Sequence, residues 1–180
     1  MNSYLELFIG PMFSGKTSKL VELYKQCTFC NIAVLTINHS SDIRYDNALM
    51  STHDQVKIDC LQLSALSDAW KHADYATAQV VLINEGQFFP DLYACVVKMM
   101  SENKKVYIAG LDGDFQRKKF GDILDLIPLC DKITKLVSLC SICKNGTVAI
   151  FSKRLTEETQ QTVIGSDNYV PVCRLCYEQK

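Results

Sequence analysis

Long apolar runs are missing from this sequence, and so is an excess of charge of either sign. No stretch approaches the ~18 uninterrupted apolar residues that a membrane helix needs, and MNSYLELFIG at the start has no basic segment or cleavage site. The 19 basic residues nearly cancel the 20 acidic ones, which removes any general attraction to nucleic acid or anionic lipid. We therefore expect a soluble, cytoplasmic protein with no nucleic-acid or membrane partner, in which any phosphate is bound locally.

Internal repeats and low-complexity segments are absent as well, and none of the three histidines suggests a ligand. Cysteine, by contrast, is frequent. Nine cysteines in a chain without a secretion signal argue against a disulfide scaffold, because the reducing cytosol keeps thiols free. They point to metal binding or to ordinary burial. The length of 180 residues with 48% apolar residues suits one domain with a small appendage.

Short β-rich runs alternate with helical patterns in the first two thirds of the chain. The runs are nearly continuous in apolar residues, which is typical of strands buried on both faces: Leu5–Ile9, Ile32–Ile37, Val80–Ile83 and Val106–Ala109. Between them, residues 16–29 and 91–102 have apolar residues at helical spacing. This order predicts an α/β fold with a parallel sheet. The polar stretch 38–55 has neither period, so we expect a surface loop there.

A phosphate-binding loop follows the first predicted strand. The sequence GPMFSGKT fits G-x-x-x-x-G-K-[ST] between a strand and a helix, the context that this motif requires. Backbone N–H groups and the helix N-terminus can bind phosphates, Lys16 can reach the terminal phosphates, and Thr17 can ligate Mg²⁺. A glycine-rich turn with an accidental lysine is the alternative. The motif predicts that a nucleoside triphosphate binds to Gly10, Pro11, Met12, Phe13, Ser14, Gly15, Lys16 and Thr17.

A second polar pair follows the strand at 80–83. P-loop proteins usually have an acidic residue at such a strand end that holds Mg²⁺ through its hydration shell. Here Asn84 stands where an aspartate is expected, and Glu85 is the carboxylate at that strand end. The alternative is a turn at Asn84 with a solvated Glu85 beside it.

Two C-x-x-C pairs, at 140–143 and 173–176, have the spacing of a tetrahedral zinc site. We therefore expect Cys140, Cys143, Cys173 and Cys176 to bind a structural Zn²⁺ that closes the loop between the pairs, with four buried core cysteines as the alternative. A third pair, Cys27 and Cys30, has no partner pair and indicates burial at a helix end. The change in composition predicts a P-loop nucleotide-binding domain at 1–139 and a zinc-binding domain at 140–180.

Together these motifs resemble the thymidine kinases of the cytosolic and poxvirus type. In chain order they are GPMFSGKT, SDIRY, STHD, EGQFFPDL, LDGDFQRKKFG, C-x-x-C, FSKRL, VIG, NY and VCRLCY. The resemblance implies a RecA-like P-loop core, a zinc-held lasso loop over thymidine, and a homotetramer, in the host cytoplasm if the protein is viral. It also implies transfer of the γ-phosphate of ATP to the 5′-hydroxyl of thymidine or deoxyuridine, giving dTMP for nucleotide salvage.

The resemblance also assigns roles to residues. Glu85 would be the general base, consistent with its place at the strand end, and would act with Lys16 and Arg44. Asp42, Asn84 and Gln87 would join the P-loop in binding the nucleotide, with a solvated loop as the alternative for Asp42 and Arg44. The residues implied for the nucleoside are Met12, Phe88, Leu111, Phe115, Phe120, Ser152, Gln161, Thr162, Val163, Ile164, Gly165 and Tyr169.

One departure from the family pattern bears on the metal. The family has aspartate immediately before the glutamate, so Asn84 predicts weaker Mg²⁺ binding and leaves open a weakened kinase homologue. The other rival is a P-loop ATPase whose zinc ribbon binds nucleic acid. Residues 141–180 contain five basic and four acidic residues, which is a poor surface for following a phosphate backbone.

Overall fold

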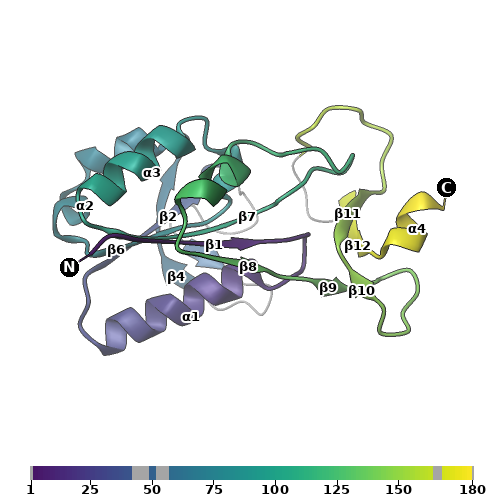
Figure 1. The fold of residues 1–180 in the computed structure, drawn as a ribbon, viewed down its shortest axis with the longest axis horizontal. Coiled ribbons are helices and arrows are strands. Elements are labelled where there is room, and N and C mark those ends of the chain that lie inside the picture. The colour runs from purple at the N-terminus through teal and green to yellow at the C-terminus, as the bar shows by residue number, and fades with distance from the viewer. Residues whose placement is uncertain (1, 42–48, 52–56, 164–167, 180) are drawn as a thin grey trace.

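The centre of the molecule is a six-stranded sheet in which every pair of neighbours is parallel (Figure 1). The structure, a computed structural model, describes residues 2–41, 49–51, 57–163 and 168–179. The strands lie in the order β5-β2-β6-β7-β1-β8. Their bounds are Tyr4–Ile9 for β1, Val34–His39 for β2, Leu61–Leu63 for β5, Val80–Ile83 for β6, Lys105–Gly110 for β7 and Lys132–Lys135 for β8. The predicted α/β class is confirmed.

Helices cover both faces of this sheet, which explains why its strands are apolar throughout. Figure 1 shows α1 (Lys16–Phe29) on one face and α2 (Ala73–Thr77) and α3 (Leu92–Ser101) on the other. Along β1 the side chains alternate between the two cores: Leu7 and Ile9 pack in the cluster of α3, and Phe8 packs in the cluster of α1. All four residues of β6 are buried. The predicted strands and helices are thus confirmed, with ends displaced by one or two residues.

The predicted loop at 38–55 is wrong in part. Asn38 and His39 are the last residues of β2 and are buried. Residues Leu49–Ser51 form β3, which pairs antiparallel with β4 (Lys57–Asp59). Polar residues are tolerated at the end of β2 because the carboxyl edge of a parallel sheet is where polar sites form. Short 3₁₀ segments complete this part of the chain at Leu66–Lys71, Gly86–Phe88 and Ile123–Leu129.

The last part of the chain forms small antiparallel pairs. Strand β9 (Ser138–Leu139) pairs with β10 (Val148–Ala149), and β11 (Phe151–Arg154) pairs with β12 (Tyr169–Val172), before α4 (Arg174–Glu178). These elements lie at the opposite end of the molecule from the N-terminus and enclose their own core of cysteines and small aliphatic residues (Figure 1). The boundary at residue 139 stays a prediction.

No helix in the described ranges combines the length and the apolar character needed to cross a lipid bilayer.

Candidate functional site

The loop between β1 and α1 has the form of an anion site. Helix α1 begins at Lys16, after Gly15 in the left-handed conformation with φ 81°. The buried Lys16 folds back over the loop, and its Nζ donates to the Pro11 carbonyl at 2.6 Å and to Ser14 Oγ at 3.4 Å. Because the first N–H groups of a helix have no partners within the helix, this end attracts an anion.

An asparagine pair lies beside the loop, across two neighbouring strand ends. Thr17 Oγ1 donates to Asn84 Oδ1 at 3.3 Å, and Asn84 Nδ2 donates to Asn38 Oδ1 at 2.9 Å. The Asn84 carboxamide is thus oriented with its nitrogen toward β2 and its oxygen toward Thr17. The Thr17 hydroxyl oxygen and the Asn84 carboxamide oxygen are neighbours, and oxygen atoms are the ligands that Mg²⁺ prefers. These two residues therefore fit the coordination or hydration shell of a magnesium ion.

Glu85 directly follows Asn84 and has a strained backbone conformation. Its φ of 55° and ψ of 41° are left-handed, which is uncommon for a residue other than glycine and is often found at functional sites. Gln87 Nε2 donates to Glu85 Oε2 at 2.7 Å, and the Leu111 N–H donates to Gln87 Oε1 at 2.9 Å. The buried Gln87 therefore connects the orientation of the carboxylate to the end of β7.

Aromatic rings form a wall of the same site, which we call the aromatic wall. Phe88 and Phe120 make an edge-to-face contact, with ring centroids 5.4 Å apart and an interplanar angle of 89°. The chain approaches closely here, because Gly121 has φ 58° and an added Cβ would lie 2.1 Å from the Gln87 carbonyl oxygen. Only glycine fits this position, and it allows Phe120 to face Phe88.

One pocket joins the P-loop, Glu85 and the aromatic wall. The predicted site residues that line it are Met12, Phe13, Ser14, Gly15, Lys16, Thr17, Glu85, Phe88, Leu111, Phe115, Phe120, Ser152, Gln161, Thr162, Val163 and Tyr169. Four further predicted residues are not part of this lining: Gly10, Pro11, Asn84 and Gln87. The remaining four, Asp42, Arg44, Ile164 and Gly165, are outside the described residues. Many of the residues that the sequence analysis assigned to one site thus line one pocket, although they come from elements that are far apart in the chain.

Asp114 is a pocket residue that the sequence analysis did not include, together with Ser18, Ser41 and Gly113. It is buried, and its Oδ1 accepts the N–H groups of Gln116 and Lys118 at 2.8 and 2.9 Å. Its Oδ2 accepts from Gln161 Nε2 at 2.8 Å. The only signal in the sequence was an aspartate in a polar loop, which by itself indicates a turn.

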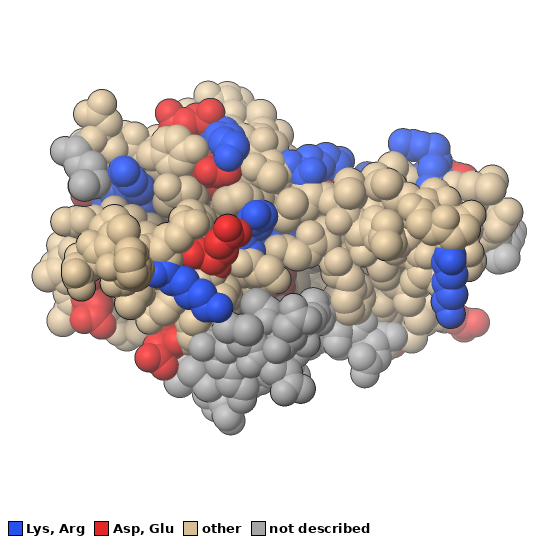
Figure 2. Space-filling model, turned by 90° about the horizontal axis from the view of Figure 1, so that it is seen from below, with Lys and Arg blue, Asp and Glu red and all other residues tan. Residues whose placement is uncertain are grey.

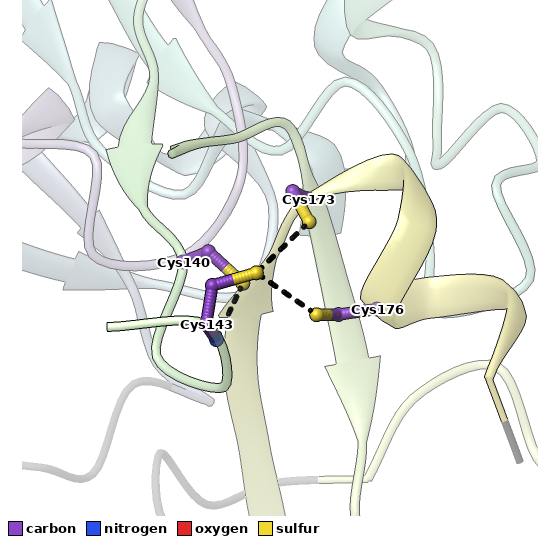
Figure 3. A group of neighbouring side chains, drawn as sticks. All are labelled: Cys140, Cys143, Cys173 and Cys176. Carbon is purple, nitrogen blue, oxygen red and sulfur yellow. Dashed lines mark hydrogen bonds between the residues drawn. The ribbon is translucent and has the colours of Figure 1, made fainter. Parts of the chain in front are cut away.

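The four predicted cysteines converge in the core of the small antiparallel part (Figure 3). Their sulfur atoms all lie within 4.8 Å of one another, and Cys143 Sγ is 3.6 Å from Cys173 Sγ and 3.1 Å from Cys176 Sγ. A tetrahedral zinc with Zn–S bonds of about 2.3 Å separates its sulfurs by about 3.8 Å, so this set fits zinc.

The pKa of one cysteine in the cluster also favours a cation. Burial raises the pKa of the Cys140 thiol, but hydrogen bonds from the N–H groups of Cys143, Cys173 and Ile142 outweigh this and lower the pKa to about 6. Cys143, hydrogen-bonded to Cys176 and Cys173, has its pKa raised to about 12. The hydrogen bonds of the cluster thus favour a thiolate at Cys140, and a divalent cation at the sulfurs would displace the protons of the other thiols.

Comparison with known proteins decides the family. Residues 3–177 match the family model described as thymidine kinase. The chain belongs to the thymidine kinase family. It is 42% identical over 176 residues to the thymidine kinase of Vaccinia virus (strain Ankara), covering 97% of this chain and 96% of the relative. The Variola virus (isolate Human/India/Ind3/1967) thymidine kinase gives the same identity and coverage, and that of Myxoma virus (strain Uriarra) is 40% identical over 174 residues, 96% of this chain and 95% of the relative.

A first prediction concerns the cysteine cluster of this thymidine kinase family member. We expect one zinc per chain, and we expect Cys173→Ser to remove most of the zinc and most of the affinity for thymidine. ATP binding should change less, because the P-loop belongs to the main sheet. Metal analysis and binding titrations of both ligands check this, with Cys30→Ser, an exposed cysteine outside the cluster, as the control. Absence of zinc from protein purified without chelator would contradict it.

A second prediction concerns Asn84. An aspartate there would add a charge next to Thr17, and the Asn38 carboxamide would turn so that its nitrogen donates to the new carboxylate. We expect Asn84→Asp to lower the Mg²⁺ concentration for half-maximal rate by about tenfold, the effect of one charge-assisted hydrogen bond. Rates titrated against free Mg²⁺ measure this, with the exposed Asn103→Asp as the control. Coincident curves for Asn84→Asp and the wild type would show that residue 84 does not influence the metal shell.

Proposed function

We propose that this protein transfers the γ-phosphoryl group of ATP to the 5′-hydroxyl of thymidine, and of deoxyuridine, giving dTMP in nucleotide salvage. Membership of the thymidine kinase family supports the reaction. The structural observation that carries the proposal is one pocket that is lined by the P-loop Lys16, the Glu85 carboxylate and the Phe88 ring. A phosphate donor, a proton acceptor and a flat apolar acceptor site are the parts that phosphoryl transfer to a nucleoside requires.

The P-loop would hold the triphosphate. Its backbone N–H groups and the start of α1 attract the phosphates, and Lys16 would exchange its bond to the Pro11 carbonyl for the transferring phosphoryl oxygens. Mg²⁺, when bound, would neutralise charge on the β- and γ-phosphates. Thr17 would be its ligand, and Asn84 Oδ1 would accept a hydrogen bond from its hydration shell. Asp42 and Arg44 are proposed beside the phosphates from the family pattern alone.

Glu85 would act as the general base. Its carboxylate is half-buried on the pocket wall, where Gln87 donates to Oε2, and it would accept the proton of the attacking hydroxyl. The left-handed backbone of Glu85 turns the chain sharply after β6, which brings the carboxylate to the carboxyl edge of the sheet next to the P-loop.

The thymine ring would lie against Phe88 and Phe120, with Phe115, Leu111 and Tyr169 completing an apolar site. Met12 and Ser152 would face its methyl group. The Met12 N–H donates to Ser152 Oγ at 2.9 Å, so the P-loop and β11 are joined at this point. A homotetramer and a structural Zn²⁺ are further parts of the proposal, based on the resemblance and on the fit of the four sulfurs.

The rival function, a P-loop ATPase that binds nucleic acid, has less support. Figure 2 shows lysine and arginine side chains interspersed with aspartate and glutamate on the face that it presents, over surface that is mostly neither. A nucleic-acid interface usually gathers basic residues on one face.

Label transfer from γ-labelled ATP to a panel of nucleosides tests the proposal. Thymidine and deoxyuridine should be labelled, whereas purine nucleosides should be too large for a site closed by Phe88, Phe120 and Tyr169. Comparable labelling of deoxyguanosine would contradict the assignment of the nucleoside site. Hydrolysis of ATP with no labelled nucleoside would contradict the kinase activity itself.

Replacement of Glu85 tests the proton acceptor. Glu85→Gln keeps the shape of the side chain but cannot accept the proton, so we expect turnover to fall by about 10² to 10⁴. ATP should still bind, because the P-loop is untouched. The matched control is Glu22→Gln, which removes an exposed carboxylate on α1 that pairs with Lys19. Turnover at the wild-type rate in Glu85→Gln would rule out Glu85 as the base.

A further inference from the structure

Arg154, the last residue of β11, is a buried arginine that no part of the proposed reaction uses. Only 8% of it is exposed, although it follows Lys153 in a polar stretch of sequence. A guanidinium has five N–H groups, and burying them without acceptors is costly. The partners of the five hydrogen bonds that Arg154 donates therefore indicate the role of this residue.

Three of these bonds go to backbone carbonyls of the lasso loop, which we define as residues 155–168 between β11 and β12. Nη1 donates to the carbonyls of Glu158 and Gln160 at 2.7 and 2.6 Å, and Nη2 donates to the carbonyl of Gln161 at 3.0 Å. One side chain at the start of the lasso thus gathers carbonyls from four to seven residues further along the chain.

The remaining two bonds go to Tyr169, at the other end of the lasso. Arg154 and Tyr169 are direct partners in the antiparallel pairing of β11 with β12. The Tyr169 hydroxyl accepts from Nε at 3.1 Å and from Nη2 at 2.5 Å, and it donates to the Val163 carbonyl at 3.2 Å. The register of two short strands therefore places both side chains at the base of the loop.

The same guanidinium also contacts Phe115 in the lining of the pocket. Its Cζ lies 3.7 Å from the centroid of the Phe115 ring and 5.1 Å from that of the Tyr169 ring. The Phe115 carbonyl, in turn, accepts from the Tyr177 hydroxyl of α4 at 2.5 Å. The ring of Phe115 is therefore held by Arg154 and its backbone by Tyr177.

We propose that Arg154 is a positioning residue that, with Tyr169, fixes the lasso backbone at Gln161 to Val163 and the Phe115 ring around the nucleoside. We name this pair the Arg154/Tyr169 clamp. The inference rests on the proposed function, since it assigns the clamp to the nucleoside side of that site. The clamp touches neither the P-loop nor Glu85 through any of the contacts described above. It therefore affects nucleoside binding rather than ATP binding or the proton transfer.

Lysine cannot replace arginine in the clamp. Its ammonium has three donors on a flexible stem, and it lacks the flat guanidinium that lies on Phe115. We expect Arg154→Lys to raise the KM for thymidine by about 10- to 100-fold, the loss of one or two hydrogen bonds to a charged group. The KM for ATP and kcat should stay within about threefold of wild type, because binding in the ground and transition states is lost equally.

Steady-state kinetics of Arg154→Lys, Tyr169→Phe and Arg174→Lys test the clamp. Tyr169→Phe keeps the ring but removes the hydroxyl, so it should raise the same KM, and the double variant should be less than additive. Arg174 is an exposed arginine on α4, and its conservative variant is the matched control. An unchanged thymidine KM in Arg154→Lys, or an equal rise in the KM for ATP, would overturn the proposal.

Chemical rescue separates a missing guanidinium from general damage. Free guanidinium ion at low millimolar concentration should lower the raised thymidine KM of Arg154→Ala, and it should have no effect on Arg174→Ala. No rescue, or equal effects on both variants, would count against the clamp.

Hydrogen exchange tests the clamp independently of activity. Amides in residues 156–163 should take up deuterium faster in Arg154→Lys than in the wild type, and equal uptake would overturn the proposal. Failure of the wild type to phosphorylate thymidine would overturn the proposed function instead, while the exchange measurement would still decide the clamp.

Discussion

Parallel pairing of the strands is the constraint on which the rest of the molecule depends. Because β1, β2, β6 and β7 run in the same direction side by side, their carboxyl ends meet at one edge. Along that edge lie the P-loop after β1, Asn38 at the end of β2, Asn84 and Glu85 after β6, and Leu111 after β7. The hydrogen bonds from Thr17 to Asn84 and from Asn84 to Asn38 cross three elements, and they form only because the strand order puts β6 beside β2. The polar and charged groups of the candidate site are thus concentrated at the carboxyl edge of the sheet.

The small antiparallel part completes the site from the opposite side. It joins the P-loop through the bond from the Met12 N–H to Ser152 Oγ, and it holds the ring of Phe115 by Arg154 and its backbone by Tyr177. Tyr177 follows Cys176 directly, so the cysteine cluster and Phe115 in the pocket lining are separated by a single residue step and one hydrogen bond. A metal at the four sulfurs would therefore stabilise the same backbone that shapes the pocket.

Local patterns in the sequence were sufficient to predict the elements in which burial is continuous or follows the helical period. Strand β6 and helix α1 match their predicted bounds, since continuous burial and helical spacing are both visible in a short window. Strand β8 was missed because Lys132–Lys135 is a mostly exposed edge strand with a charged residue at each end. The partner of Asn84 was not predictable, because Asn38 lies 46 residues away. The burial of Arg154 was not predictable either, because its partners are loop carbonyls, which leave no mark in side-chain periodicity.

The central claim is that one pocket holds the phosphate donor and the nucleoside on either side of Glu85. The measurement that tests it most directly is a crystal structure with thymidine, Mg²⁺ and a non-hydrolysable ATP analogue. The account predicts the terminal phosphate on Lys16 and the P-loop amides, and the thymidine 5′-oxygen within about 3.2 Å of a Glu85 oxygen. A nucleoside bound away from Phe88 and Phe120, or a 5′-oxygen facing away from Glu85, would contradict it.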